Sequence, residues 1–230
     1  GMGPAHFDVK KFGADFAYTL DGDTEGEIQY ENFNAARAVV EFTGVNVHPG
    51  SSKNTMVNAA LVAIEFNSML PSADTPRDTE EYEGFFHLDA MNGNVSTAML
   101  DYIIRDHDVA SFDCRLKTME HIAKILNEKW GEGTVKLTIT EQYRNMKEII
   151  DTCMELIDCA TAACKECGTP ALITPIRGGT DGARLSFMGV PCPNLGTGGH
   201  AFHGPYEHIT VEGMDIAVEV GLKIIELFYK

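Results

Sequence analysis

The stretch RLKTMEHIAKILNEKWGEGTVKLTITEQY, Arg115–Tyr143, decides the fold of the middle of this chain. Its first part predicts a helix that ends at Gly131, because glycine is a common residue just beyond the last helical turn. Its last part, 134–143, alternates apolar and polar residues with a period of two, which is typical of a half-buried strand. The predicted end of this unit is therefore a helix followed directly by a strand.

The residues before this stretch predict the rest of the same unit. β-Branched and aromatic residues predict a strand at 36–45. Apolar residues at helical spacing predict a helix at 52–70, with Ser51 or Ser52 as its N-cap. Two further strands are predicted at 84–95 and 99–108. The resulting order, β-α-β-β-α-β, is that of a ferredoxin-like split unit.

The segments on either side of this unit return to alternating helices and strands. A strand is predicted to end in a turn at Asp21-Gly22, a long helix to cover 146–167, and a final helix to cover 212–230. Shorter elements are predicted between these two helices: a strand at 171–176, a helix at 183–189 and a strand at 192–196. The predicted fold class is α/β, with one layer formed by 1–33 and 144–230 and interrupted by an inserted unit, 34–143.

Composition limits the function. The 230 residues carry a formal net charge of −16 at pH 7, which argues against nucleic acid as a partner because the phosphate backbone would repel the chain. No apolar run is long enough to cross a membrane, and the N-terminus lacks the basic and then apolar pattern of a secretion signal. The expected location is therefore the cytoplasm, with no membrane partner.

Six cysteines allow more than one interpretation. Cys164 and Cys167 have the C-x-x-C spacing of zinc knuckles and redox pairs, and Cys153 and Cys159 lie just upstream. The surrounding stretch, MKEIIDTCMELIDCATAACKECG, instead reads as one amphipathic helix, in which cysteine behaves as a small buried apolar residue. Reduced, structural thiols are the expected state.

Histidines gather in the Gly-rich loop LGTGGHAFHGPYEHITVEGM. His200, His203 and His208 lie within nine residues, and a glycine after His203 lets the backbone turn sharply. Neutral imidazole is a common zinc ligand, so a metal site is one interpretation, and three surface histidines in a polar loop are the other. Asp21 also allows two interpretations. Its carboxylate, at the end of a predicted strand, could bind a metal ion, or the residue could simply be part of a common Asp-Gly turn.

Three further residues are candidates for binding a substrate. His48 follows the first strand of the inserted unit and is either a hydrogen-bond donor to a substrate oxygen or a turn histidine. Arg105 ends an apolar strand and Arg177 begins the loop RGGTDG, and arginine binds carboxylates through two hydrogen bonds. The structural alternative for Arg105 is a salt bridge to Asp106 or Asp108. The glycines that follow Arg177 would let a ligand approach the backbone closely.

Five motifs extend in order over nearly the whole chain: FGADFAYTLDG, NVHPGSSKN, YIIRDHD, RGGTDGARLSFMGVPCPNLGTGG and FHGPYEHITVEGM. Together they resemble the peptidase T family, the tripeptide aminopeptidases among the co-catalytic two-zinc exopeptidases. The resemblance implies a catalytic domain, 1–33 and 144–230, interrupted by a lid or dimerisation domain, 34–143. It also implies a small peptide substrate, two zinc ions and a homodimer formed through the lid domain.

The resemblance also assigns roles to individual residues. Asp21 resembles the carboxylate ligand of one zinc ion, and His203 resembles the histidine ligand of the other. His48 resembles the lid histidine that reaches a neighbouring subunit's site and stabilises the tetrahedral intermediate. The residues that resemble substrate-binding groups are Arg105, Arg177, Asn94 and Gly178. His200 and His208 are implied to be loop neighbours rather than ligands.

One part of the family pattern is not found in these 230 residues. The family also carries a His-x-Asp motif, an aspartate that bridges the two zinc ions, and a Glu-Glu pair that supplies the general base and a further ligand. Glu80 and Glu81 are adjacent, but they fall in the predicted lid and follow no suitable strand. The chain is therefore expected to be a C-terminal fragment, with exposed apolar surface and little or no activity of its own.

Two other functions remain open at this point. The chain could act only as a dimerisation or binding module. Alternatively, the enzyme could be a related carboxypeptidase or aminoacylase, because loops of the RGGTDG and FHG type are shared broadly among such hydrolases. The full motif set favours removal of the N-terminal residue from tripeptides, and it leaves open which tripeptides are preferred.

Overall fold

The computed structural model describes residues 3–229. Its internal contacts divide the chain into two compact units, each with its own hydrophobic core. The outer unit combines Gly1–Phe33 with Arg144–Lys230, and the inserted unit is Asn34–Tyr143. Both units contain helices and strands, so the predicted α/β class is confirmed.

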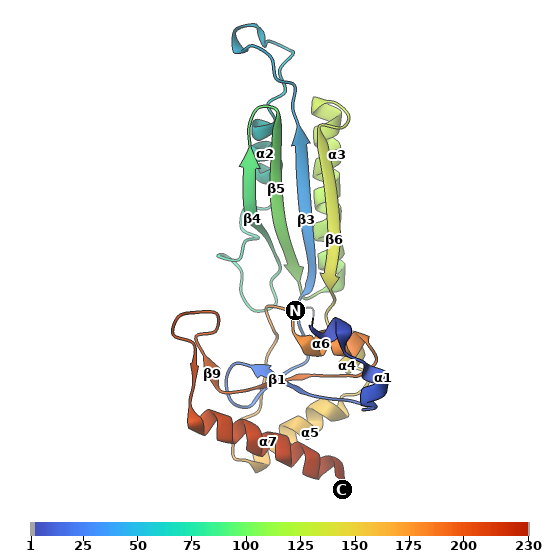
Figure 1. Ribbon diagram of the computed structural model, residues 1–230, viewed down its shortest axis with the longest axis vertical. Helices are drawn as coiled ribbons and strands as arrows, with labels where there is room; N and C mark the ends of the chain where they lie inside the picture. Colours follow the sequence, from blue (N-terminus) through green and yellow to red (C-terminus); the bar gives the residue numbers. More distant parts are fainter. Residues whose placement is uncertain (1–2, 230) are drawn as a thin grey trace. The chain divides into compact units, whose positions relative to one another are not determined.

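The inserted unit is a four-stranded antiparallel sheet with two helices on one face (Figure 1). Its strands are β3 (Asn34–Thr43), β4 (Phe85–Gly93), β5 (Thr97–Asp106) and β6 (Val135–Tyr143), in the order β4-β5-β3-β6. Its helices are α2 (Ala59–Ser68) and α3 (Val109–Trp130), and a short 3-10 helix, η2 (Pro49–Ser51), precedes α2. The chain order confirms the predicted ferredoxin-like unit.

The core of the inserted unit lies between its sheet and its two helices. On the central strand β3, every second residue from Ala36 to Phe42 is buried in this core, whereas Arg37 and Glu41 are exposed on the other face. Phe66 of α2 packs edge-on against Phe42, with ring centres 5.8 Å apart. Burial of each large aromatic side chain contributes about 1.5–3 kcal/mol, so the period-two pattern of β3 directs much of the stability of the unit.

The N-cap of α2 differs from the prediction. Asn58 caps the helix, because its side-chain oxygen accepts hydrogen bonds from the backbone N–H groups of Ala60 at 3.1 Å and Leu61 at 3.4 Å. Ser51 and Ser52 lie instead at the end of η2, where their hydroxyls donate to backbone carbonyl oxygens. The prediction of a serine cap was therefore wrong.

Both ends of α3 are fixed by local hydrogen bonds. The helix begins at Val109, earlier than the predicted Arg115, because Asp108 caps it by accepting from the backbone N–H of Ser111 at 2.7 Å. Gly131 ends the helix as predicted, and its N–H donates to the carbonyl oxygen of Asn127 at 2.9 Å.

Glu65 joins the two helices of the inserted unit. Its carboxylate accepts hydrogen bonds from the Lys129 ammonium and from the Trp130 indole, the latter at 3.0 Å. The hydrogen bond from Lys129 is the main reason that the pKa of Glu65 is lowered. A lowered pKa means that the Lys129–Glu65 interaction stabilises the folded unit above the ordinary pKa of glutamate. This stabilisation is lost as the pH falls through the lowered pKa of Glu65.

The outer unit holds a second four-stranded sheet, in the order β1-β8-β2-β7. These strands are β1 (Thr19–Gly22), β2 (Glu27–Gln29), β7 (Leu172–Ile173) and β8 (Asn194–Gly196). β1 is parallel to β8 and β2 is parallel to β7, whereas β2 and β8 are antiparallel. A separate ribbon pairs β9 (Gly199–His200) with β10 (His208–Ile209).

The helices of the outer unit vary widely in length. They are η1 (Gly3–His6), α1 (Val9–Phe12), α4 (Lys147–Ile150), α5 (Glu155–Glu166), α6 (Asp181–Phe187) and α7 (Val211–Tyr229). α5 and α7 pack against each other, and α7 is the predicted final helix. Within residues 3–229, every helix is too short or too polar to cross a membrane.

The single helix predicted over 146–167 is in fact two helices, α4 and α5. The hydroxyl of Thr152 donates to the carbonyl oxygen of Ile149 at 2.7 Å, and the N–H of Cys153 donates to Ile150 at 2.9 Å. Such local bonds replace the regular helical pattern and end α4. Both helices still contribute buried residues to the core of the outer unit.

The strand predicted over 171–176 is also shorter than expected, because only Leu172–Ile173 pairs as a strand. Pro175 has no N–H to donate to a neighbouring strand, which limits how far the pairing extends. Ile176 forms an isolated parallel bridge with Asn32 instead.

The cysteines are all free thiols. Cys164 of α5 and Cys192 are buried, and burial raises the pKa of Cys192 to about 11. Burial also raises the pKa of Cys164. Both thiols are therefore protonated at neutral pH and pack as apolar side chains, which is the behaviour expected of structural cysteines.

A buried asparagine pair connects the two segments of the outer unit where the inserted unit begins and ends. The side-chain oxygen of Asn145 accepts from the N–H of Asn32 at 3.0 Å, and that of Asn32 accepts from the N–H of Met146 at 2.8 Å. The amide nitrogen of Asn32 donates to the carbonyl oxygen of Arg144 at 3.1 Å. Asn32 and Asn145 are 0% and 6% exposed, so loss of either side chain would leave buried polar groups without partners, at about 1–3 kcal/mol each.

We predict that Asn58→Ala lowers the free energy of unfolding of the inserted unit by about 1 kcal/mol, because two N–H groups at the start of α2 lose their acceptor. Urea unfolding followed by the fluorescence of Trp130 measures this change, because the single tryptophan of the chain lies in the inserted unit. Ser51→Ala is the matched control and is expected to change this free energy by less than about 0.5 kcal/mol. Equal losses in the two variants would contradict the role of Asn58.

Candidate functional site

A bulge at the end of β1 sets the position of Asp21. In the parallel pairing of β1 with β8, Leu20 lies opposite Leu195 and Gly22 lies opposite Gly196, so Asp21 is an extra residue in β1. A bulge redirects the side chain of the extra residue. Asp21 is an exposed residue at the end of a strand, where the sequence predicted it, although its carboxylate is partly buried.

The residues next to Asp21 are closely packed at backbone level. A Cβ atom on Gly196 would lie 1.8 Å from the carbonyl oxygen of Thr24, so this position requires glycine. A Cβ atom on Gly22 would lie 3.0 Å from the Cα of Gly196. The close approach of these two backbones fixes the strand end that carries Asp21.

The segment after β8 is hydrogen-bonded to the same strand end. Thr197 donates to the carbonyl oxygen of Gly22 from its N–H at 3.2 Å and from its hydroxyl at 2.8 Å. The N–H groups of the next two residues donate to the carbonyl oxygen of Asp23 at 2.8 and 3.1 Å. This segment leads into β9, so the backbone that carries Asp21 is connected through a few hydrogen bonds to the ribbon that carries His203.

His203 lies in the loop between β9 and β10. Its φ angle is +60°, in the left-handed region that residues other than glycine adopt infrequently. Its N–H donates to a carboxylate oxygen of Glu207 at 3.0 Å, and the N–H of Gly204 donates to the carbonyl oxygen of Ala201 at 3.1 Å. Such a backbone conformation costs about 1–3 kcal/mol and is often found at functional sites.

His203 contributes to the electrostatic environment of Asp21, although the two residues are far apart in the sequence. The pKa of Asp21 is raised, first by partial burial and then by the carboxylates of Asp181 and Asp23. The charge of His203 acts in the opposite direction and lowers this pKa. The hydrogen bonds from Thr197 and Gly199 to the end of β1 agree with this, because they hold the start of the ribbon beside the strand end that carries Asp21.

Asp23 and Asp181 are neighbours of Asp21 that the sequence motifs did not single out. Asp181 is the first residue of α6, after Thr180, whose hydroxyl accepts from the N–H of Gly182 at 3.3 Å and caps the helix. Asp181 belongs to the RGGTDG loop that the sequence singled out for Arg177, but a carboxylate at a helix start is also a common structural signal, so the sequence alone did not assign it to the site. Together with Asp21, these carboxylates create a negative region that favours a cation.

The loop RGGTDG presents Arg177 at the surface of the outer unit. The Arg177 guanidinium lies over the ring of Phe33, 5.2 Å from its centre, and the carbonyl oxygen of Gly178 accepts from the N–H of Phe33 at 3.3 Å. The atom nearest to a Cβ built on Gly178 would be Cγ2 of Ile176, at 3.9 Å. Packing therefore leaves space beside this backbone, which a ligand could use.

His48 lies in the inserted unit, at the start of η2. Its Nδ1 accepts a hydrogen bond from the backbone N–H of Gly50 at 3.1 Å. A nitrogen that accepts carries no proton, so the neutral ring is protonated at Nε2. The side chain is exposed. His48 is therefore a turn histidine that also offers an N–H donor, and the two interpretations of the sequence are compatible.

Asn94 and Arg105 have structural partners within the inserted unit. The side-chain oxygen of Asn94 accepts from the N–H groups of Ser96 at 2.8 Å and Thr97 at 3.2 Å, in the turn between β4 and β5. Arg105 donates to two backbone carbonyl oxygens of the sheet and to the side chain of Gln142 at 3.2 Å. These contacts fix the position of both side chains.

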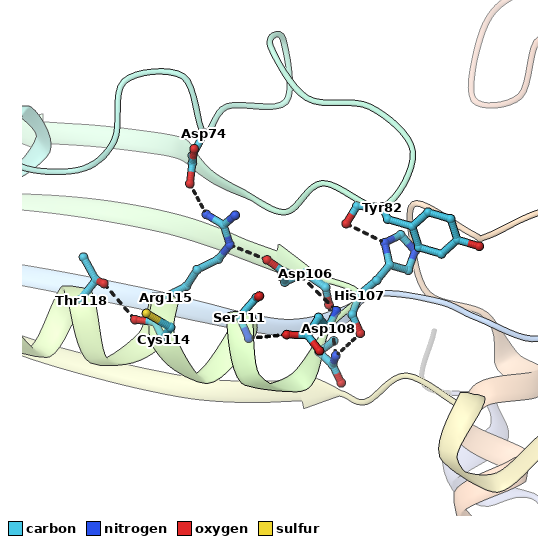
Figure 2. Close-up of polar contacts among 10 residues, drawn as sticks. Asp74, Tyr82, Asp106, His107, Asp108, Ser111, Cys114, Arg115 and Thr118 are labelled. Carbon is cyan, nitrogen blue, oxygen red and sulfur yellow. Dashed lines mark hydrogen bonds and ion pairs between the residues drawn. The ribbon is translucent and has the colours of Figure 1, made fainter. Parts of the chain in front are cut away.

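The carboxylates that follow Arg105 in the sequence have other partners (Figure 2). Asp106 accepts from Nε of Arg115 at 2.8 Å, and the same guanidinium reaches Asp74 at 2.6 Å. Asp108 caps α3. Among the ion pairs of residues 3–229, Arg105 pairs with neither carboxylate, so the salt-bridge interpretation of Arg105 was wrong. Arg115 instead connects the segment before β4 to β5 and α3.

Asp21 and His203 are metal-capable donors in one region of the outer unit. A carboxylate oxygen and an imidazole nitrogen are both ordinary zinc ligands. Among residues 3–229, no set of three or more His, Cys, Asp or Glu side chains is arranged to hold a metal ion. The described residues thus offer these two donors, with the carboxylates of Asp23 and Asp181 contributing negative charge nearby.

Known proteins share both the sequence and the fold. Residues 30–134 match the family model of a peptidase dimerisation domain. The chain is 56% identical to peptidase T of Clostridium perfringens over 228 residues, which are 99% of the chain. It is 53% identical to peptidase T of Alkaliphilus oremlandii over 230 residues. The chain is a peptidase T homologue. It spans 56% of the length of each of these two relatives.

Solved structures of peptidases have the same fold at much lower identity. The aminopeptidase PepT of Bacillus cereus aligns with a TM-score of 0.86 and 20% identity, over 100% of this chain and 61% of that chain. A tripeptidase of Staphylococcus aureus aligns with a TM-score of 0.85 and 19% identity, over 98% of this chain and 60% of that chain. These two similarities establish that the fold of this homologue is shared with solved peptidases.

We predict that Asp21→Asn stabilises the outer unit at neutral pH in the presence of a metal chelator, because it removes a carboxylate whose pKa is raised by burial and by neighbouring carboxylates. A raised pKa means that the folded state favours the protonated carboxyl group. The ionised carboxylate therefore destabilises the folded state at high pH, and this destabilisation disappears as the pH falls. Thermal midpoints of the variant and the unaltered chain should therefore differ at pH 7 and converge at about pH 3.

Asp15→Asn is the control for this prediction, because Asp15 is an exposed carboxylate of the same unit. Its effect on the thermal midpoint at pH 7 is expected to be smaller than that of Asp21→Asn. A midpoint for Asp21→Asn at or below that of the unaltered chain at pH 7 would show that the carboxylate repulsion is not significant.

Proposed function

We propose that this chain is part of a zinc-dependent aminopeptidase that releases the N-terminal residue of tripeptides. The observation that supports the proposal most is that hydrogen bonds from Thr197 and Gly199 join the strand end that carries Asp21 to the ribbon that carries His203. We assign Asp21 as a ligand of one zinc ion and His203 as a ligand of the other. The relatives named peptidase T, at 53–56% identity, support the reaction, and the name of the solved tripeptidase supports the substrate class.

The chemistry of the two donors fits zinc. Carboxylate and neutral imidazole are both zinc ligands, and a cation beside Asp21 would offset the repulsion from Asp23 and Asp181 that raises its pKa. When bound, zinc would polarise the scissile carbonyl group and activate water. The contribution of this chain is to hold the donors, with the β1 bulge orienting Asp21 and the left-handed loop orienting His203.

His48 is proposed to stabilise the tetrahedral intermediate through its Nε2–H group. The hydrogen bond from Gly50 to Nδ1 keeps the ring in the tautomer that has this donor. A donor that is already oriented stabilises a developing oxyanion without the cost of reorganisation.

The proposed substrate-binding groups are Arg105, Arg177, Asn94 and Gly178. A guanidinium binds a carboxylate through two parallel hydrogen bonds, so the arginines suit the free C-terminus of a short peptide. The space beside the backbone of Gly178 would admit the main chain of such a peptide.

We propose that 1–33 and 144–230 form the catalytic domain and that 34–143 is the lid and dimerisation domain. The match of residues 30–134 to a peptidase dimerisation domain supports a homodimer formed through the inserted unit. We also propose the cytoplasm as the location of the enzyme.

A second candidate function is dimerisation without catalysis, and the same family match favours it. Sedimentation of the 230-residue chain over a range of concentrations tests this alternative. A monomer at the highest concentration would contradict dimerisation by the chain itself and would leave the catalytic proposal unaffected.

The outer face of α7 is apolar, although it is exposed. Six large apolar residues recur there at the 3.6-residue spacing of a straight helix: Val211, Met214, Val218, Leu222, Ile225 and Tyr229. The opposite face, with Val220 and Ile224, is buried in the core of the outer unit. A helix with two apolar faces is normally covered on both sides. Because the relatives are longer than this chain, we propose that the remaining part of a peptidase T polypeptide covers the outer face.

We predict that the chain gains tripeptidase activity when it is combined with the part of Clostridium perfringens peptidase T that has no counterpart in it. The chain alone, with zinc, is expected to show little or no activity, because a general base is typically worth about 10²–10⁴-fold and none is assigned to it. Release of the N-terminal residue from a tripeptide measures both samples. Turnover by the chain alone close to that of the combination would refute the proposed division of the site.

Variants of the combined enzyme test the assigned roles. His48→Ala is expected to lower kcat by about 10²–10³-fold with little change in KM, because it removes a donor to the oxyanion. Asp21→Ala and His203→Ala are expected to lose bound zinc together with activity. His121→Ala, which changes an exposed histidine of α3, is the matched control and should retain both.

We predict that Leu222→Asp on the outer face of α7 weakens the association of the chain with the remaining part of peptidase T by about 10–100-fold, because burial of a leucine contributes about 1.5–3 kcal/mol. Glu219→Gln, on the same helix but outside the apolar stripe, is expected to leave the affinity unchanged. Calorimetric titration of one part with the other gives both values. Equal affinities for the two variants would mean that another surface makes the contact.

A further inference from the structure

The ribbon of β9 and β10 carries two histidines opposite each other. In its antiparallel pairing His200 faces His208, and Gly199 faces Ile209. The two imidazole rings have centres 5.3 Å apart, and their planes are inclined by 34°. Both histidines are exposed, so a small ligand in solution can reach their rings.

The hydrogen bond of His208 indicates which of its ring nitrogens is free to bind a ligand. Nδ1 of His208 lies 2.8 Å from the carbonyl oxygen of Tyr206. A carbonyl oxygen can only accept, so Nδ1 carries the proton and Nε2 of the neutral ring keeps its lone pair. Histidines that bind metals commonly donate their other N–H to a backbone carbonyl in this way, which fixes the orientation of the ring.

The separation of the two rings suits a shared metal ion. Two imidazoles that bind one zinc ion at a tetrahedral angle, with metal–nitrogen bonds of about 2.0–2.1 Å, have ring centres roughly 5 Å apart. The rings of His200 and His208 have centres 5.3 Å apart. The observed spacing of the ring centres therefore matches the spacing expected for two imidazoles bound to one ion.

We propose that His200 and His208 form a binding site for a divalent metal ion of the zinc, nickel and copper class, separate from the zinc ligands assigned above. Imidazole nitrogen suits these metals, and water would complete the coordination at an exposed pair. His203 is not assigned to this site, because it lies in the loop between the two strands rather than on either of them. The proposal does not rest on the proposed peptidase function.

A metal ion at this pair would link β9 to β10 on either side of the loop that carries His203. Each of these strands has only two residues, so few backbone hydrogen bonds hold the ribbon together. An ion bound by both strands would therefore reduce the motion of the loop and hold His203 more firmly.

Calorimetric titration of the 230-residue chain with NiCl₂ tests the proposal. His200→Phe and His208→Phe are each expected to weaken nickel binding by at least about tenfold, because a single remaining histidine cannot chelate the ion. His121→Phe, which changes an exposed histidine of α3, is the matched control and is expected to leave the affinity unchanged. His203→Asn shows whether nickel binds at Asp21 and His203 instead, since asparagine tolerates the left-handed conformation of this position. Circular dichroism establishes that each variant keeps its fold.

A second measurement needs no variant to detect binding. Nickel broadens the NMR signals of the rings that it contacts, so two of the eight histidine rings in the unaltered chain are expected to broaden first. Unchanged affinity in both phenylalanine variants would overturn the proposal. Loss of binding in His203→Asn alone would also overturn it, because nickel would then occupy the site of Asp21 and His203. Neither measurement involves peptide hydrolysis, so a failure here is distinct from a failure of the proposed function.

Discussion

The outer unit depends on a buried hydrogen-bond network at the two points where the inserted unit begins and ends. Asn32 and Asn145 supply the partners that the backbone there lacks, through bonds of 2.8–3.1 Å. Asn32 is 0% exposed, so water cannot replace any of these partners. Because the network joins the two segments of the outer unit, these segments form one hydrophobic core although Asn34–Tyr143 lies between them in the sequence.

The candidate site is held at some cost to stability. Partial burial and then the neighbouring carboxylates raise the pKa of Asp21, and His203 is kept at a φ angle of +60°. Strained backbone and perturbed carboxylates are often found together at functional sites, because the arrangement that suits a ligand differs from the one that best stabilises the empty protein. A bound cation would offset the repulsion around Asp21, which links the cost in stability to the function that we propose.

Most of the inserted unit could be predicted from the sequence, because its strands and helices follow local periods. The alternation before Tyr143 and the helix stop at Gly131 both agree with the structure. Two of the errors, one in each unit, arose where polar side chains compete for backbone groups. Asn58 rather than a serine caps α2, and the hydroxyl of Thr152 helps to divide one predicted helix into two. Several nearby side chains could have made each of these bonds, and only the folded geometry selects one of them.

By itself, the sequence predicted the order of the main helices and strands and marked Asp21 and His203 as candidate metal ligands, because periodicity and motif residues are local properties of the chain. Only the tertiary structure decided that Asp181 contributes to the charge around Asp21 and that His200 faces His208 across a ribbon. These proximities depend on the pairing of β1 with β8 and on the turn between β9 and β10. Electrostatic and coordination interactions act through space, so residues that are distant in the sequence become partners only when folding brings them close together.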